Sequence, residues 1–234
     1  MAQSSTRQAV YQKAMNSNEI YHVLKEDILN LNIYPGQMIS ENEIAALYHV
    51  SRTPVKIAFV RLESEGFIEV IPQKGTYVKH IDAKHIRDIV YMRYVLEVDM
   101  CKLALRTSNL GDLIEGLREN LSEQERIIAE PSLSPYAFYE VDSKFHHMLF
   151  THTGKEQIWS VIQANQVHYT RFRILDTTLT ARYSQLLTEH RHILKAIEEL
   201  DEPALDKYIY KHMHSNLSHL EKSTGRHMGY LINN

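Results

Sequence analysis

The turn-forming residues of this chain are few and unevenly placed. Among 234 residues there are 8 glycines and 6 prolines, and six of these 14 lie between residues 35 and 75. Beyond residue 79 the apolar residues recur at three- and four-residue spacing over long segments, a pattern typical of amphipathic helices. We therefore expect a mainly α-helical chain, with small elements in residues 1–78, a flexible arm within 1–17, and an all-helical domain over 79–234.

The composition is that of an ordinary globular protein, and it excludes several classes. With 44% apolar and 24% charged residues, the chain is neither disordered nor of low complexity. Its 26 Lys and Arg against 29 Asp and Glu give a net charge of −3, so any DNA contact must be local. A single cysteine, Cys101, excludes an internal disulfide and a Cys-rich zinc module. No segment has the apolar length of a signal peptide or a membrane span, so we expect a cytoplasmic protein without a membrane partner.

Two short helices joined by a tight turn are predicted in the N-terminal region. Ser40 and Glu43 have the spacing of a capping box, in which Ser40 accepts from the amide of residue 43 and Glu43 reaches back to the amide of residue 40. This spacing predicts a helix at 41–49. Ser51 is the candidate cap of a second helix, which ends at Gly66. Together they form a helix-turn-helix.

A hairpin and six long helices complete the pattern. Residues 67–71 and 76–78 are rich in β-branched and aromatic residues and flank a turn, so they are predicted to form the wing of a winged helix-turn-helix. The long helices are expected to form an antiparallel six-helix bundle, whose interior is a usual place for a ligand or metal site. The helices expected besides those of the helix-turn-helix are at residues 18–31, 82–106, 109–129, 135–151, 156–175, 179–199 and 203–223.

The order of these motifs resembles that of the GntR-type bacterial transcription regulators. The N-terminal region is similar to the DNA-binding domain of that family, and the helical region resembles the effector domain of its FadR branch, called the FCD domain. The resemblance extends over residues 18–220, and six rather than seven effector helices place it nearer to the VanR-like subgroup. The segments that carry it are Pro35–Gly36, Ile39–Ala45, Val50–Lys56, Arg61–Gly66, Lys74–Val78, Arg93–Glu97 and Asp142–His146, together with Glu189, His190 and His212.

The expected DNA contacts lie at the start of the second helix, which in a helix-turn-helix enters the major groove. Arg52 is the expected base reader, because a guanidinium pairs bidentately with guanine, and Thr53 lies beside it. Lys56 stands where the family usually has arginine and offers only a point charge. Further expected contacts are Asn42, where some members carry arginine, and Lys74 and Gly75 at the wing tip.

Only modest DNA affinity is expected from a single N-terminal domain, because residues 1–78 hold 7 basic against 8 acidic side chains. A homodimer that reads two half-sites fits this balance better. The resemblance implies the same, with a pseudo-palindromic operator of double-stranded DNA.

Histidine is abundant in the second half of the chain, where nine of the 14 lie between His146 and His219. Asp142 and His146 are one helical turn apart, so both side chains leave one face of a helix. The family places its metal ligands at four motif positions, so the resemblance implies a metal site of Asp142, His146, His190 and His212. Three imidazoles and one carboxylate suit Zn²⁺, Ni²⁺, Mn²⁺ or Fe²⁺ and leave coordination positions open.

Three arginines are candidates for effector binding. Arg93 has the i, i+4 spacing of an ion pair with Glu97. The resemblance implies that the Arg93 side chain faces the cavity, where it could bind an effector carboxylate. Arg171 and Arg173 are similar candidates. The sequence thus indicates a repressor or activator that is not an enzyme and responds to a small carboxylate or sugar acid bound at a metal. Two alternatives stay open: a sensor in which the ion itself is the signal, and a less favoured metal-dependent hydrolase, in which the N-terminal domain has no role.

Overall fold

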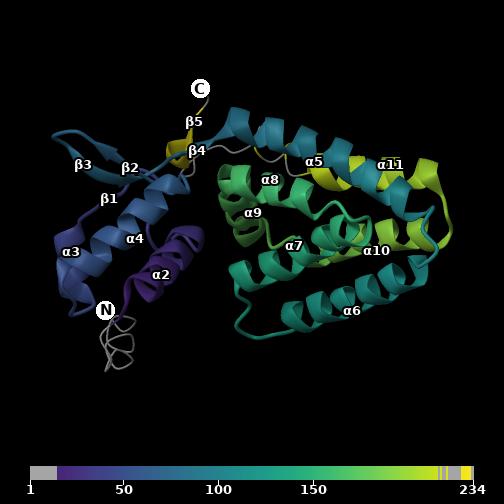
Figure 1. The fold of residues 1–234 in the computed structure, drawn as a ribbon, viewed down its shortest axis with the longest axis horizontal. Coiled ribbons are helices and arrows are strands. Elements are labelled where there is room, and N and C mark those ends of the chain that lie inside the picture. Colours follow the sequence, from purple (N-terminus) through teal and green to yellow (C-terminus); the bar gives the residue numbers. More distant parts are fainter. Residues whose placement is uncertain (1–14, 216, 218–219, 221–227, 233–234) are drawn as a thin grey trace. The chain divides into compact units, whose positions relative to one another are not determined.

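The structure is a computed structural model that describes residues 15–215, 217, 220 and 228–232. The chain divides into two compact units, Met1–His80 and Ile81–Asn234 (Figure 1). Residues 1–14 of the predicted arm lie outside the described residues, as does most of the last predicted helix beyond residue 215. Asn16 and Ser17 do not belong to an arm, because Asn16 caps the first helix and Ser17 begins it.

The N-terminal unit is a winged helix-turn-helix, as predicted. Its three strands form an antiparallel sheet in the order β1-β3-β2, in which Ile68 pairs with Val78 and Ile71 with Gly75. The short strand β1 has no sequence signal, because two residues are too few to show an alternating pattern. The elements are α2 (Ser17–Leu29), β1 (Met38–Ile39), α3 (Glu41–Leu47), α4 (Arg52–Ser64), β2 (Ile68–Ile71) and β3 (Gly75–Val78).

The helix caps differ from the predicted ones. Ser40 does cap α3, but it accepts from the amide of Asn42 at 3.3 Å in place of residue 43, so the predicted capping box is wrong. A serine cap can reach the second or the third amide of a helix, and spacing alone does not decide between them. Ser51 makes no side-chain cap hydrogen bond to α4. The capping box of this unit lies at the start of α2, between Asn16 and Glu19.

A cluster of polar side chains links α2 to the end of α4. The Tyr21 hydroxyl donates to Glu65 Oε2 at 2.6 Å, and Lys25 Nζ donates to the same oxygen at 3.0 Å. Arg61 Nε donates to Glu65 Oε1 at 3.1 Å, and its guanidinium lies 3.6 Å from the centroid of the Tyr21 ring. Burial acts to raise the pKa of Glu65, but the hydrogen bonds from Tyr21 and Lys25 outweigh it and hold that pKa below its ordinary value.

Glu65→Gln is expected to destabilise the N-terminal unit by about 1 kcal/mol, because an amide replaces a charged acceptor of three donors. The pKa of Glu65 is lower in the folded than in the unfolded chain, so the carboxylate stabilises the fold above the unfolded-state pKa of about 4.3. That contribution is lost as the pH falls through the folded-state pKa. The melting temperature, followed by circular dichroism, should differ less between the variant and the wild type at about pH 3 than at about pH 7. An equal difference at both pH values would contradict the charge-based account.

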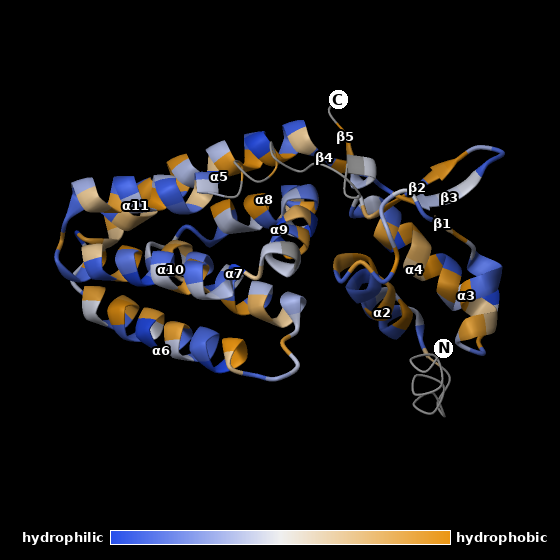
Figure 2. Ribbon diagram, turned by 180° about the vertical axis from the view of Figure 1, so that it is seen from behind, coloured by the Kyte–Doolittle hydropathy of each residue, from blue (hydrophilic) through white to orange (hydrophobic). Residues whose placement is uncertain are grey.

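The C-terminal unit is a helical bundle. Five of its helices follow one another in a closed ring, α5, α11, α10, α6 and α7, each packed against the next, and α9 packs against α5 and α7. Hydrophobic and hydrophilic residues alternate along helices such as α6 (Figure 2), as burial of one face requires. No helix within the described part of the chain has both the length and the apolar character needed to span a bilayer. The elements are β4 (Ile81–Asp82), α5 (Ala83–Ala104), α6 (Leu110–Ile128), α7 (Pro135–His152), α8 (Glu156–Asn165), α9 (Val167–Thr180), α10 (Tyr183–Glu198), α11 (Glu202–Ser215), the 3-10 turn η1 (Met228–Tyr230) and β5 (Leu231–Ile232), which pairs in parallel with β4.

The bundle has seven helices in the described residues, in place of the six predicted. The predicted helix at 156–175 is wrong, because α8 ends at Asn165 and α9 follows after Gln166. No glycine or proline marks this break. His85 Nε2 lies 2.5 Å from the carbonyl oxygen of Asn165, and the Gln166 amide donates to the Tyr139 hydroxyl at 3.2 Å. The His85 contact occupies a backbone carbonyl that would accept a helical hydrogen bond if the helix were continuous, whereas the Gln166 contact uses a side-chain amide. With seven helices, the VanR-like assignment loses the helix count on which it rests.

Candidate metal centre and nucleic-acid interface

The four predicted ligands meet inside the ring of helices. Asp142 and His146 lie one turn apart on α7, His190 lies on α10, and His212 lies on α11. All four side chains are buried, and one donor atom from each lies within 4.8 Å of the others. Donors about 2.0–2.2 Å from one ion lie up to roughly 4.4 Å apart, so the four donor atoms are close to the spacing of a shared ion.

The ring nitrogens that face away from the cluster are held by acceptors on three helices. His146 Nδ1 lies 2.6 Å from Glu97 Oε2 on α5, and His212 Nδ1 lies 2.9 Å from Glu189 Oε2 on α10. His190 Nδ1 lies 2.9 Å from the side-chain oxygen of Gln124 on α6. Since these oxygens only accept, each Nδ1 carries the hydrogen and each Nε2 presents a lone pair. Such acceptors orient metal-binding imidazoles and raise their basicity.

The donor atoms that face one another have no hydrogen to share. His146 Nε2 and His212 Nε2 lie 3.3 Å apart, and both carry lone pairs. Asp142 Oδ2 and His190 Nε2 are buried without a hydrogen-bond partner. Burial lowers the pKa of His146 and His190, which favours the neutral imidazole that binds a metal. Buried acceptors that face only one another fit a cation, so these residues fit the group that the resemblance implies.

Two buried arginines border the cluster. Arg173 Nη2 donates to Asp142 Oδ1 at 2.8 Å, and Arg93 Nε donates to Glu97 Oε1 at 2.8 Å. Burial acts to raise the pKa of Glu97, but the charges of Arg93 and His146 outweigh it and lower that pKa to about 2. Arg93 Nη2 and Arg173 Nε are buried without a hydrogen-bond partner. Two nitrogen donors, on arginines that bind Asp142 and Glu97, are thus left without an acceptor and could bind an anion.

The third predicted effector residue lies elsewhere. Arg171 is two residues from Arg173, and two residues turn a helix by about 200°, so the two side chains leave opposite sides of α9. Arg171 is buried with no hydrogen-bond partner for its guanidinium, and burial alone lowers its pKa to about 10. The geometry brings Arg93 and Arg173 to the cluster and leaves Arg171 apart from it.

The sequence did not predict that Gln124 is the hydrogen-bond acceptor that orients His190. It also did not predict that Glu189 orients His212 in the same way. Gln124 has a detectable signal, because it falls between Leu121 and Ile127 in the apolar stripe of α6, where a polar residue needs a buried partner. His214, the residue most easily confused with His212, stacks on Tyr210 and lies outside the cluster.

Gln124→Ala is expected to weaken metal binding by about 10–100-fold, because His190 loses the acceptor that fixes its tautomer and ring orientation. Competition with a chelating indicator measures this affinity. The matched control is Gln163→Ala on α8, whose side chain is exposed and contacts Ser143. Equal affinities of the two variants would show that Gln124 does not position His190 for a metal.

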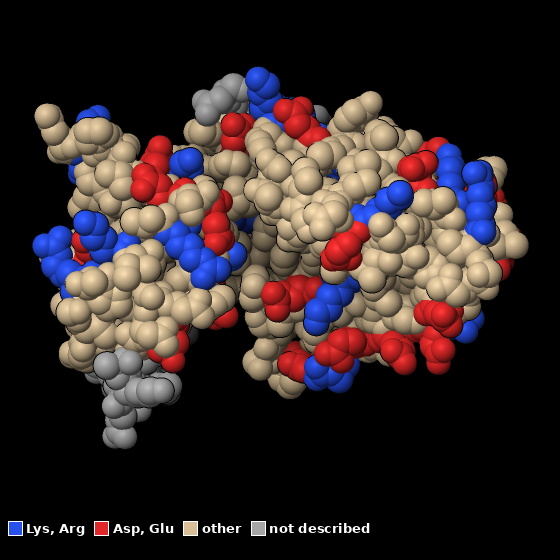
Figure 3. Space-filling model, viewed as in Figure 1, with Lys and Arg blue, Asp and Glu red and all other residues tan. Residues whose placement is uncertain are grey.

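The predicted DNA contacts lie on exposed parts of the N-terminal unit. Arg52, Thr53 and Lys56 are exposed on the first turns of α4, and Asn42 is exposed on α3. Arg52 is 66% exposed and donates to Glu41 Oε2 at 3.2 Å, so its guanidinium must leave this carboxylate to bind a base. Lysine and arginine side chains project at the outer edge of this unit, and acidic side chains are interspersed with basic ones over the rest of its visible face (Figure 3).

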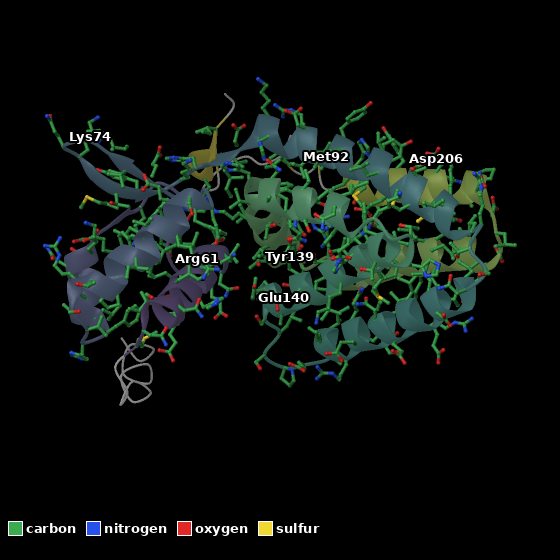
Figure 4. All side chains as sticks on the ribbon, in the orientation of Figure 1. Arg61, Lys74, Met92, Tyr139, Glu140 and Asp206 are labelled. Atoms are coloured by element: carbon green, nitrogen blue, oxygen red, sulfur yellow. The ribbon has the colours of Figure 1, made fainter. Side chains whose placement is uncertain are left out.

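The wing also has the predicted features. Lys74 lies at the tip of the β2–β3 hairpin (Figure 4). Gly75 is exposed beside it with a φ of +126°, a conformation that residues with a Cβ rarely adopt. The tip can therefore approach a DNA backbone or minor groove closely.

A winged helix-turn-helix followed by a helical unit with a buried His/Asp cluster is the architecture of a DNA-binding regulator with a separate C-terminal domain. The chain belongs to the GntR family of bacterial regulatory proteins: the profile of that family matches residues 16–78, and the FCD domain profile matches residues 88–215. The chain is a transcriptional regulator with an FCD effector domain, and its relatives are regulators and not enzymes.

Two curated relatives cover most of the chain. The HTH-type transcriptional repressor RspR of Escherichia coli strain K12 is 29% identical over 199 residues, which are 84% of this chain and 85% of RspR. An HTH-type transcriptional regulator from an unstable DNA locus of Streptomyces ambofaciens is 30% identical over 208 residues, 88% of this chain and 86% of that protein.

Solved structures share the fold. A GntR transcriptional regulator from Rhodococcus sp. RHA1 matches with a TM-score of 0.69 at 18% identity, over 89% of this chain and 99% of that chain. E. coli McbR/YncC matches with a TM-score of 0.66 at 18% identity, over 88% of this chain and 97% of that chain.

Proposed function

We propose that this regulator binds a divalent transition metal at Asp142, His146, His190 and His212, and that a small carboxylate effector bound at the metal controls operator affinity. The observation that carries the proposal is the group of buried atoms without partners, Asp142 Oδ2, His190 Nε2, Arg93 Nη2 and Arg173 Nε. The bound ion supplies a positive charge that attracts a carboxylate. Arg93 and Arg173 hold its oxygens and fix its orientation.

Effector control follows from the position of these groups on different helices. Arg93 lies on α5, Arg173 on α9 and His212 on α11, so an acid held between them contacts three helices at once. An acid that binds one arrangement of these helices more tightly than another shifts the population toward it. Operator affinity then changes by the same coupling free energy, typically about 1–3 kcal/mol. We place this activity in the cytoplasm, where the operator is.

The test compares operator affinity in four states of the purified protein: metal-free after chelation, metal-loaded, and each of these with a panel of small mono- and dicarboxylic acids. We expect at least one acid to change the affinity only when the metal is bound. If metal alone produces the full change and no acid adds to it, the ion is the signal and the acid effector is refuted.

We also propose that the regulator works as a homodimer through the outer face of α5. Tyr91 is 67% exposed there, Val95 is exposed one turn further on, and Tyr210 is exposed on the adjacent α11. Figure 4 labels Met92, the neighbour of Tyr91 on α5, and Asp206, one turn before Tyr210 on α11. Interfaces are rich in such aromatic side chains. If two copies of α5 cross antiparallel at Val95, the exposed Asp88 lies opposite Lys102 of the second copy, since both are seven residues from Val95.

Val95→Cys in a Cys101→Ala background is expected to give a disulfide-linked dimer under mild oxidation, because a residue on the twofold axis meets its own copy. Cys101 is the chain's single cysteine and is buried, so the background contains no other thiol. Non-reducing gel electrophoresis measures the product. The control is Val161→Cys, a similarly exposed position on α8. Equal cross-linking of the two variants would refute this interface, and a monomer in sedimentation would refute the dimer itself.

A further inference from the structure

Two aliphatic side chains are exposed on α4, the helix that carries the expected base reader. Ile57 is 55% exposed and Val60 is 58% exposed. Ile57 lies one turn beyond Thr53, and Val60 lies one turn beyond Lys56. The four residues therefore form one continuous surface, with its polar end at the start of the helix and its aliphatic end in the second and third turns.

This aliphatic pair is not part of the protein core. The helix packs through another face against α2, α3 and β2, and the buried residues of that face are Val55, Ala58, Phe59 and Leu62. Single exposed apolar residues are common and need no explanation. Ile57 and Val60 are instead adjacent and continuous with the surface that carries Thr53 and Lys56, which suggests a shared binding partner.

The chemistry of the major groove determines what such a pair can read. Base edges there offer hydrogen-bond donors and acceptors, and the C5-methyl of thymine is the apolar group. Arginine and lysine select guanine, whereas aliphatic side chains gain free energy only by burying a methyl group. We infer that Ile57 and Val60 bind the C5-methyl group of thymine in each operator half-site, next to the bases read by Arg52. This inference rests on the DNA-reading role of α4.

Replacing thymine by deoxyuridine tests the inference, because it removes the methyl group and leaves base pairing intact. A duplex is first selected from a random-sequence library with the full-length wild-type protein. Each thymine is then replaced singly, and the dissociation constant is measured by fluorescence anisotropy at fixed salt concentration. At one or two thymines per half-site we expect binding about fourfold weaker, the loss for one buried carbon.

The variants decide whether Ile57 and Val60 cause the effect. In Ile57→Ala/Val60→Ala the sensitivity to deoxyuridine should disappear at those thymines, while it should remain in the controls Leu47→Ala on α3 and Val70→Ala on β2, which are similarly exposed. Because these positions are exposed, the substitutions remove no core contact, and circular dichroism checks that the variants are folded. Unchanged sensitivity in the double variant overturns the inference and leaves DNA reading by α4 intact. A wild-type protein that selects no sequence overturns both.

Discussion

His190→Ala combined with His212→Ala is expected to abolish binding of divalent metal, lowering it from about one ion per chain to none, because two of the four predicted ligands are removed. Asp142 and His146 remain, and two ligands on one helix turn bind a transition metal too weakly to survive gel filtration. Elemental analysis of the desalted protein measures the stoichiometry.

The control for this variant is His214→Ala, which removes a histidine from the same helix as His212 but from outside the cluster. It should retain the metal of the wild type. An unchanged stoichiometry in the double variant would refute the site at these residues. Circular dichroism should accompany both measurements, because the double variant leaves the side chains of Gln124 and Glu189 without their imidazole partners.

Arg52→Ala is expected to abolish specific operator binding while the fold and the metal content stay unchanged. A bidentate arginine–guanine contact is worth about 1–3 kcal/mol, and a dimer on two half-sites loses two of them, so affinity should fall by at least about 30-fold. The exposed ion pair of Arg52 with Glu41 contributes little to folding, so stability should not change.

The measurement compares binding of the selected operator and of a scrambled duplex at the same salt concentration. Arg52→Ala should bind both duplexes alike, at the weak level of the scrambled one. Arg87→Ala, an exposed arginine on α5 of the helical unit, is the matched control and should keep the wild-type preference. If Arg52→Ala keeps its preference for the operator, Arg52 is not the base reader.

Local signals account for what the sequence predicted well. The helix-turn-helix follows from Ser40 at the start of its first helix and Gly66 beyond the end of its second, and the wing follows from two β-branched segments beside the turn before Gly75. These signals act within a few residues. Asp82 caps α5, at the start of the helix expected over 82–106, and accepts from the amides of Lys84 and His85. The i, i+4 pair of Arg93 and Glu97 also forms, because helix geometry alone brings such residues together.

Contacts between distant residues account for what the sequence did not predict. At the break, Asn165 and Gln166 contact His85 and Tyr139, which are remote in the chain, and no local pattern anticipates these contacts. The acceptors that orient the histidines are a similar case, since Gln124 reaches His190 across 66 residues. Family motifs located the four candidate ligands but carried no information on which ring nitrogen faces the cluster.

The distribution of the candidate ligands has a consequence for the unfolded chain. Measured along the sequence, His146 and His190 are 44 residues apart and His190 and His212 are 22 apart, so an ion bound by all three closes two long loops. A cross-link of this kind restricts the unfolded chain and favours the folded one, as a disulfide does, although the chain's single cysteine permits no internal disulfide. The ion would act as a reversible cross-link, and the free energy of unfolding of the helical unit would increase with the concentration of free metal.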